Sequence, residues 1–371
     1  MGLLAAGCSH QPAGHHGATA EGSARAANGT KAAAVEGRAP TALPYNPRGV
    51  DFAQAPEKIA FAGGANQNEA QPLWKTVLAA SPDLFLFVGD LVDATDTNSI
   101  SDQYKKLDAL ADYRNAREKI PFMAIWNDRD LGTLDGGADA ATKAQARRDF
   151  LNHWVYVKDS IPFNRDGLYH AKLMGGQVSG KRRKRVSGPT MQVIMLDTRS
   201  FRSPLKKASE GPRRFAVNDD KSATLLGNDQ WEWLEDQLQK PAQLRVIVTP
   251  IQLVATEPNA ENWGLFPHER EKFFQLLKKT KAKNVLVLSG DRRLASIAKT
   301  DVKGWGPLYD VTAGPINEAD AELENDSTYV SPVYIKENFG LLDIDWKRKR
   351  VGIEIKDIEG KTVQSVSIKL N

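Results

Sequence analysis

The chain has 371 residues, 41% of them hydrophobic and 26% charged, a composition typical of globular proteins. Its 50 basic and 46 acidic residues leave a net charge of +4, too balanced to favour nucleic acid as a partner. No run of 18 apolar residues predicts a membrane-spanning helix, and the single cysteine excludes an internal disulfide framework.

The first residues contain Leu-Leu-Ala-Ala-Gly-Cys at positions 3–8, which resembles a bacterial lipobox whose cysteine becomes the lipidated first residue. Signal peptides carry a positive start and an apolar core of about 7–15 residues. Here the apolar stretch is shorter and no Lys or Arg precedes it, so we expect the true start to lie upstream. The hypothesis is a bacterial cell-envelope lipoprotein, held to a membrane through Cys8. A chance Ala/Gly/Cys string is the alternative.

We therefore interpret residues 1–8 as the remnant of a lipoprotein signal. Residues 9–50 are rich in Ala, Gly, Ser and Pro and poor in large apolar side chains. Such a segment buries too little surface to offset its ordering entropy, so a disordered linker is predicted. Residues 51–371 are predicted to form the folded domain.

From Glu57 onward, short apolar strands alternate with amphipathic helices, the pattern of a layered α/β fold. Buried strands are predicted at Lys58–Ala62, Leu84–Val88, Phe122–Ile125, Met191–Leu196, Arg245–Thr249 and Val285–Leu288. Helices are predicted at Asn68–Ala80, Ser101–Arg117, Asp139–Val155, Asp229–Leu238 and Pro267–Thr280. Alternating patterns at Phe339–Trp346, Gly352–Lys356 and Val363–Ile368 indicate antiparallel strands at the C-terminal end.

The densest basic run, Lys181–Arg185, has two interpretations. It is typical of a solvated hairpin tip, and it is also typical of a segment that docks on anionic lipid or another polyanion.

Ligands of open α/β sheets gather beyond the carboxyl ends of the strands. The segments that follow the predicted strands here are Gly63–Asn66, Gly89–Asp93, Asn127–Asp130, Pro250–Gln252 and Gly290–Arg293. Two of them begin with Gly-Asp, a pair that suits a metal centre because Gly allows close backbone approach and Asp supplies hard oxygen.

This set of motifs resembles the alkaline phosphatase D (PhoD-like) branch of the calcineurin-like metallophosphoesterases over residues 57 to about 370. Three further segments carry the resemblance without an evident catalytic need: Leu196–Leu205, Leu226–Leu234 and Asn262–Glu271. The resemblance implies a four-layer α/β/β/α sandwich. It also implies a two-metal site, often iron with calcium, that cleaves phosphate mono- or diesters.

Several motif positions depart from the family pattern. Ala65 stands where the family has a cysteine ligand, Asp93 stands where it has tyrosine, and Asn127 stands where it has aspartate. Arg129 and Arg293 replace the two motif histidines, whereas Asp90 is kept. A guanidinium has no lone pair to give and repels a metal, so no tightly bound cofactor is expected. The oxygen ligands that remain for a weak Ca²⁺ or Mg²⁺ are Asp90, Asp93, Asn127, Asp128 and Asp291.

The two arginines leave two alternatives open. Arg129 and Arg293 either bind a phosphate group, or they pair with Asp90, Asp128 and Asp291 and close the old centre. The favoured function is accordingly a pseudo-phosphatase that binds a phosphorylated ligand or an envelope protein. The alternatives are an active phosphatase or phosphodiesterase with a rebuilt oxygen-ligand metal site, and a purely structural envelope protein.

Overall fold

The computed structural model describes residues 45–50, 53–95, 97–179, 185–210, 213–257, 260–319 and 323–371, without the side chains of 177–187. The lipobox with Cys8, most of the linker and the side chains of the basic run Lys181–Arg185 lie outside the described residues. The boundaries at residues 8 and 50 therefore stay predictions.

Two six-stranded mixed sheets form the centre of the domain. The first has the order β14-β13-β12-β1-β2-β3, and the second has the order β10-β11-β9-β8-β5-β4. The strands of the first sheet are β1 (Lys58–Ala62), β2 (Leu84–Phe87), β3 (Phe122–Ala124), β12 (Asn338–Asp345), β13 (Arg350–Asp357) and β14 (Thr362–Lys369). Those of the second are β4 (His170–Ser179), β5 (Arg185–Met195), β8 (Leu244–Thr249), β9 (Val285–Ser289), β10 (Ser296–Val302) and β11 (Gly306–Thr312). A separate short pair consists of β6 (Lys206–Lys207) and β7 (Phe215–Ala216).

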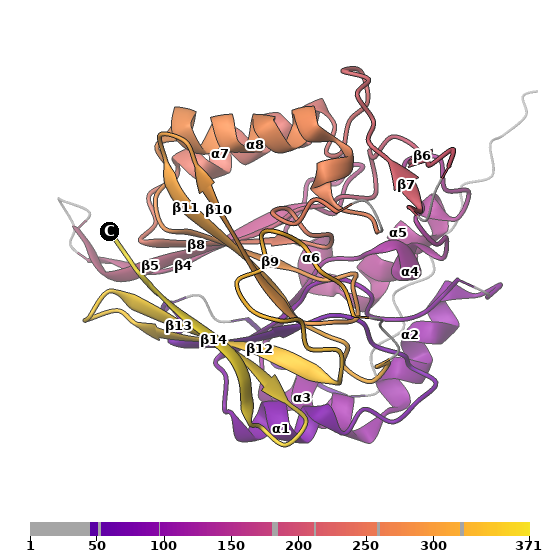
Figure 1. Ribbon diagram of the computed structural model, residues 1–371. Helices are drawn as coiled ribbons and strands as arrows, with labels where there is room; N and C mark the ends of the chain where they lie inside the picture. The colour runs from indigo at the N-terminus through magenta and orange to yellow at the C-terminus, as the bar shows by residue number, and fades with distance from the viewer. Residues whose placement is uncertain are drawn as a thin grey trace, which may run out of the picture. The chain divides into compact units, whose positions relative to one another are not determined.

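Helices cover the outer faces of both sheets (Figure 1). On the first sheet Trp74 of α1 (Leu73–Ala79) packs edge-on against Phe85, and α3 (Ala111–Lys119) lies beside α1. On the second sheet, α7 (Asn228–Gln239) and α8 (Pro267–Thr280) share a buried apolar cluster with β8 and β9. The remaining helices are α2 (Ile100–Ala109), α4 (Asp128–Leu131), α5 (Lys143–His153), α6 (Val155–Lys158) and a 3₁₀ turn at Trp263–Leu265. The predicted four-layer α/β/β/α sandwich is confirmed. Among the described helices, none is long and apolar enough to cross a bilayer.

One predicted helix is wrong. Residues 101–117 form parts of two helices, α2 and α3, because the backbone at Leu110 is extended (φ −70°, ψ 117°). The apolar pattern runs through the break, since Leu107 of α2 and Tyr113 of α3 are both buried in the same core. Periodicity alone therefore could not locate it. Strands β4, β10 and β11 were also missed by the sequence pattern.

Gly340 of β12 makes the pairing of the first sheet possible. It lies opposite Phe61 of β1, and a Cβ at this position would overlap the Phe61 ring. Gly340→Ala is expected to destabilise the protein by about 1–3 kcal/mol, the usual cost of overpacking a core. Urea denaturation checks this value. The matched control is Gly352→Ala on β13, where a Cβ would meet Asp343 O at an ordinary 3.7 Å. Equal midpoints for the two variants would contradict the prediction.

Candidate functional site

The strand-end loops of both sheets meet at one edge of the domain. Strands β1, β2 and β3 are mutually parallel, as are β5, β8 and β9. The amide of Gly63, after β1, donates to Ala313 O after β11 (3.1 Å), and Gly64 N donates to Gly89 O after β2 (3.4 Å). The predicted motifs are thereby brought together from two different sheets.

Two glycines allow this close approach. Gly89 has φ +109°, and a Cβ there would lie 2.7 Å from Asn127 Cβ. A Cβ on Gly290 would lie 2.7 Å from Val88 O. The residues that follow them, Asp90 (φ +53°) and Asp291 (φ +72°), occupy the left-handed region, which few residues other than Gly, Asn and Asp tolerate.

Three carboxylates form the centre of the site. One oxygen from each of Asp90, Asp128 and Asp291 lies within 4.8 Å of the other two. Burial, together with Asp128 and Asp291, raises the pKa of Asp90 well above its usual range. Burial and Asp128 raise the pKa of Asp291 to about 6. Clustered buried carboxylates repel one another, so the group calls for counter-charge or hydrogen-bond donors.

Asn127 supplies donors to this group. Its Nδ2 donates to Asp291 Oδ1 (2.8 Å) and to Asp90 Oδ2 (3.1 Å). Its Oδ1 accepts from Nε and Nη2 of Arg199 at 2.8 and 2.6 Å. A guanidinium only donates, so the amide oxygen faces Arg199 and the amide NH₂ faces the carboxylates. Asn127 therefore acts as a hydrogen-bond donor to the centre, not as an oxygen ligand.

Arg199 belongs to a fully buried ion-pair network. Its Nη1 lies 2.6 Å from Glu261 Oε2, and Arg202 Nε lies 2.7 Å from the other oxygen of Glu261. Arg199 Nη2 is also 3.6 Å from Asp291 Oδ1. Burial alone would lower the pKa of Arg199, but Glu261, Asp128 and Asp291 outweigh it and raise that pKa. A permanently charged side chain thus sits beside the three carboxylates.

The loop after β5 holds Arg199 in this place. Asp197 is buried, and its Oδ1 accepts from the amides of Arg199 and Ser200, both at 2.9 Å. The same oxygen accepts from Nε1 of Trp126, the residue before Asn127 (2.9 Å). Asp197 therefore ties the β5 loop to the loop that carries Asn127.

The two motif arginines have other partners than those expected. Arg129 forms an ion pair with Asp93, and Arg293 forms one with Glu318. Burial would raise the pKa of Asp93, but hydrogen bonds from Thr95 and the charge of Arg129 lower it. The predicted pairing of both arginines with the carboxylates of the central trio is thus corrected, and Asp93 lies with Arg129 rather than in that trio.

Asp130, two residues after Asp128, has a structural role. It is buried and accepts from the amides of Leu91, Val92 and Asn127 at 2.9–3.1 Å. It joins the segment Gly89–Asp93 to the segment Asn127–Asp130, and burial raises its pKa to about 7.

The side chains that could ligate a metal here do not fit a two-metal centre. Of the five oxygen ligands considered from the sequence, Asp93 pairs with Arg129 and Asn127 presents its NH₂ group. Three carboxylates remain, which suits one hard cation such as Ca²⁺ or Mg²⁺ better than iron or zinc. Among the described residues no histidine joins this cluster: His153 lies against Asp108 (3.4 Å), His170 against Leu168 O (2.8 Å) and His268 against Ala223 O (2.6 Å).

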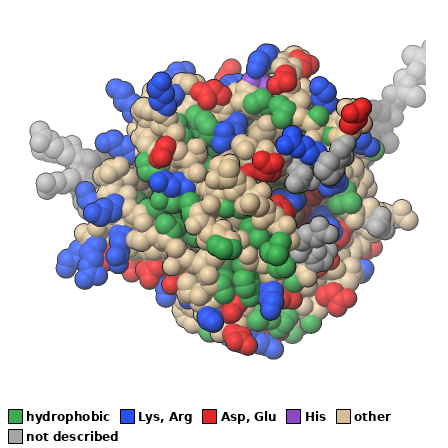
Figure 2. Space-filling model, in the orientation of Figure 1, with side chains coloured by type: hydrophobic (Ala, Val, Ile, Leu, Met, Phe, Trp, Pro, Cys, Tyr) green, Lys and Arg blue, Asp and Glu red, His purple; other side chains and the backbone are tan. Residues whose placement is uncertain are grey.

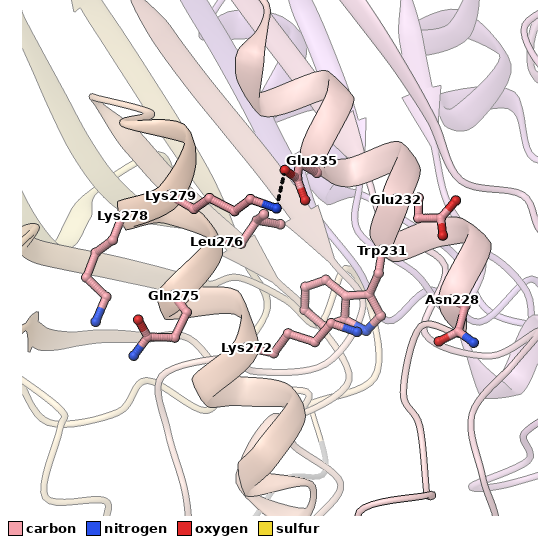
Figure 3. Close-up of a pocket in the computed structure, with 9 residues that line it drawn as sticks. All are labelled: Asn228, Trp231, Glu232, Glu235, Lys272, Gln275, Leu276, Lys278 and Lys279. Atoms are coloured by element: carbon pink, nitrogen blue, oxygen red, sulfur yellow. Dashed lines mark ion pairs between the residues drawn. The ribbon is translucent and has the colours of Figure 1, made fainter.

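A groove of about 500 Å³ lies elsewhere, on the outer face between α7 and α8 (Figure 3). Lys272 Nζ lies 4.7 Å from the Trp231 ring centre, and Lys279 pairs with Glu235 at 2.6 Å. Its lining has both charge signs and no residue from the strand-end loops, so we do not place the function there.

Arg199, Glu261 and Glu318 are the site residues that sequence reasoning missed. The first lies in the segment Leu196–Leu205, which was assigned no catalytic need. The strand-end rule, applied to the predicted strand Met191–Leu196, would have indicated it. Glu318 follows β11, a strand parallel to β9 that the sequence pattern missed, so the strand-end rule was not applied to it.

Two helix layers around two mixed sheets, with an acidic edge at the strand ends, define a metallophosphoesterase-type fold. A family model described as PhoD-like phosphatase matches residues 102–338, and the chain belongs to that family. The solved structure of PhoD is similar with a TM-score of 0.67 and 15% identity, over 87% of this chain and 71% of that one. GAP50, the anchor in the inner membrane complex of Plasmodium, is similar with a TM-score of 0.53 and 10% identity, over 86% and 90%. No curated protein sequence matches the chain.

Proposed function

We propose that this member of the family is a pseudo-phosphatase, which binds a phosphorylated ligand or partner without two-metal hydrolysis. The observation that carries the proposal is the replacement of both motif histidines by arginines, each ion-paired at the site edge, to Asp93 and to Glu318. Two-metal hydrolysis needs cations to activate water and to stabilise the leaving oxygen. Three carboxylates and an Asn127 amide that donates to two of them do not supply that arrangement.

Arginine also supports the binding part of the proposal. A guanidinium grips phosphate through two parallel hydrogen bonds and keeps its charge at every physiological pH. The side chains of Arg129 and Arg293 are 22% and 14% exposed, so their edge reaches solvent. A bound phosphate group would replace the carboxylates of Asp93 and Glu318 as the partner of the two guanidinium groups. GAP50, which is described as an anchor, has a similar fold, so this fold is compatible with a role in partner binding.

The test measures binding and turnover on the same preparation. We expect inorganic phosphate or a phosphopeptide to bind, and Arg129→Gln/Arg293→Gln to weaken binding at least ~10-fold, because hydrogen bonds to charged groups contribute roughly 1.5–3 kcal/mol each. Arg114→Gln/Arg148→Gln, which removes the same charge elsewhere, is the control. Absence of phosphate binding, with both ion pairs intact in phosphate-soaked crystals, would favour a purely structural envelope protein.

An active phosphatase or phosphodiesterase is the second candidate, favoured by the three carboxylates within 4.8 Å of one another. The protein would be loaded in turn with Ca²⁺, Mg²⁺, Mn²⁺, Zn²⁺ or iron and given a chromogenic phosphodiester. Our proposal expects turnover well below ~1 s⁻¹, the low end for ordinary enzymes. Faster turnover that Asp90→Asn abolishes would establish the second candidate instead.

We further propose that the protein is a lipoprotein of the bacterial cell envelope, attached to its membrane through Cys8. The lipobox-like residues 3–8 and the linker composition of residues 9–50 support this. Mass spectrometry of the native N-terminal peptide is expected to find a diacylglyceryl adduct on Cys8 as the first residue. An unmodified Cys8 within a longer N-terminal peptide would refute it.

A further inference from the structure

The end of the domain opposite the candidate site carries many exposed basic side chains. Strand β9 runs from Val285 to Ser289 and delivers Asp291 to the site. Lys281 and Lys283, which precede this strand, therefore lie at its other end. Both are exposed.

Other basic residues join them at this end. The turn between β12 and β13, together with the first residue of β13, contains four consecutive exposed ones, Lys347–Arg350. This turn contacts the end of β14, since Leu370 N donates to Lys349 O (2.8 Å). Asn371 N then donates to Asn284 Oδ1 (2.8 Å), next to Lys283. We name this continuous surface the basic end. Its eight basic residues are Lys278, Lys281, Lys283, Lys347, Arg348, Lys349, Arg350 and Lys369.

Exposed carboxylates such as Glu57 and Asp343 border the basic end, but among the described residues one ion pair forms within it. Asp345 pairs with Arg348 at 3.3 Å, but Arg348 remains 78% exposed. A groove of about 790 Å³ connects α8 to β14, and its lining includes Lys278, Lys281, Lys283 and Lys369 but no Asp or Glu. In Figure 2, Lys and Arg side chains gather on the left, the side on which Figure 1 draws the C-terminus.

Aromatic residues lie among these charges. Trp305 and Tyr309 line the groove and are partly exposed, and Trp305 Nε1 donates to Ala282 O (2.6 Å). Trp346, in the β12–β13 turn, donates to Pro56 O (3.2 Å), so the segment that enters β1 also lies at this end. Tryptophan and tyrosine favour the interface between lipid headgroups and hydrocarbon, where their rings stay apolar and their N–H or O–H stays wet.

We propose that the basic end docks on the surface of an anionic lipid bilayer. Basic residues are attracted to anionic headgroups, and a strand-end site at the far end of the sheets then points away from the membrane. Tryptophan and tyrosine side chains among the charges suit the headgroup region of a bilayer better than the backbone of a nucleic acid. This contact is separate from the proposed lipid on Cys8 and independent of the proposed ligand.

The test uses the full chain with Cys8→Ser, so that no lipid contributes. Sedimentation with vesicles of phosphatidylcholine alone, or mixed with phosphatidylglycerol, measures binding. We expect binding only to the anionic vesicles. Each neutralised residue should weaken it roughly fivefold, so Lys281→Gln/Lys283→Gln and Arg350→Gln/Lys369→Gln should each lose ~10–25-fold, and their combination at least ~100-fold.

The control removes the same charge elsewhere. Lys105, Lys106, Lys206 and Lys207 are exposed on α2 and β6, and replacing all four with Gln should change binding less than ~3-fold if position matters more than net charge. Equal losses in the two quadruple variants would overturn the proposal. So would absence of binding to anionic vesicles, or tighter binding to a DNA duplex than to those vesicles at the same salt concentration.

Discussion

Arg199→Met is expected to lower the free energy of unfolding by about 3–5 kcal/mol, one of the largest effects for a single substitution in this chain. Arg199 is fully buried, and its loss would leave Glu261 with Arg202 alone and free the Asn127 amide oxygen. A buried charge or acceptor without its partner keeps its full desolvation cost, whereas the new methionine gains little packing. Urea denaturation, with the slope of the transition compared between variants, measures the loss.

The matched control is Arg348→Met, which removes an arginine from an ion pair with Asp345 on the surface. Exposed pairs contribute about 0–1 kcal/mol, so this variant should stay close to the parent. A loss below ~1 kcal/mol for Arg199→Met would show that Glu261 and Asn127 tolerate the missing guanidinium at little cost. The network would then not hold the site together.

Returning histidine to the two motif positions should recover transition-metal binding. Arg129→His/Arg293→His, combined with Ala65→Cys and Asn127→Asp, is expected to bind Zn²⁺ or Mn²⁺ at least ~1000-fold more tightly than the parent. A unit charge about 4 Å from another costs about 4 kcal/mol at an effective dielectric constant near 20, and a divalent ion doubles this cost. The change removes two positive charges from the edge of the site and adds ligand atoms. Titration calorimetry and elemental analysis measure the affinity and the stoichiometry.

Lysine provides the comparison for this experiment. Arg129→Lys/Arg293→Lys, with the same Ala65→Cys and Asn127→Asp changes, keeps both positive charges and should leave metal binding weak. If this variant binds as tightly as the histidine one, charge is not what excludes the metal. Tight, stoichiometric metal in the parent protein would contradict the proposed loss of the two-metal centre directly.

Local patterns were sufficient for part of the elements and for the acidic edge. Strand β1 and helix α8 have the predicted bounds, because a buried apolar run and a first-turn proline mark them independently of the rest of the chain. The meeting of Asp90, Asp128 and Asp291 followed from the rule that loops gather beyond parallel strand ends.

The partners of the arginines could not be predicted in the same way. Arg129 forms an ion pair with Asp93, which lies in the loop after β2. Glu318, in the loop after β11, forms an ion pair with Arg293. Both pairings depend on loop conformations that leave no periodic signal. Arg199 depends on Asp197, which folds the β5 loop through three hydrogen bonds to one oxygen. The residue types at the motif positions showed that the metal ligands had changed. Only the path of the backbone shows that the positive charge beside the carboxylates belongs to Arg199.

The left-handed backbone at Asp90 and Asp291 affects how any mutant of this site should be designed. Alanine there would remove the charge and also place a residue without a hydrogen-bonding side chain in an unfavourable conformation, at a cost of roughly 1–2 kcal/mol. Asparagine tolerates the conformation and isolates the electrostatic effect. Glycine would relax the turn outright. Replacing Asp90 and Asp291 with glycine could therefore raise the melting temperature. The same change would remove two of the three carboxylates that could bind a ligand, so stability and binding make opposite demands on these two positions.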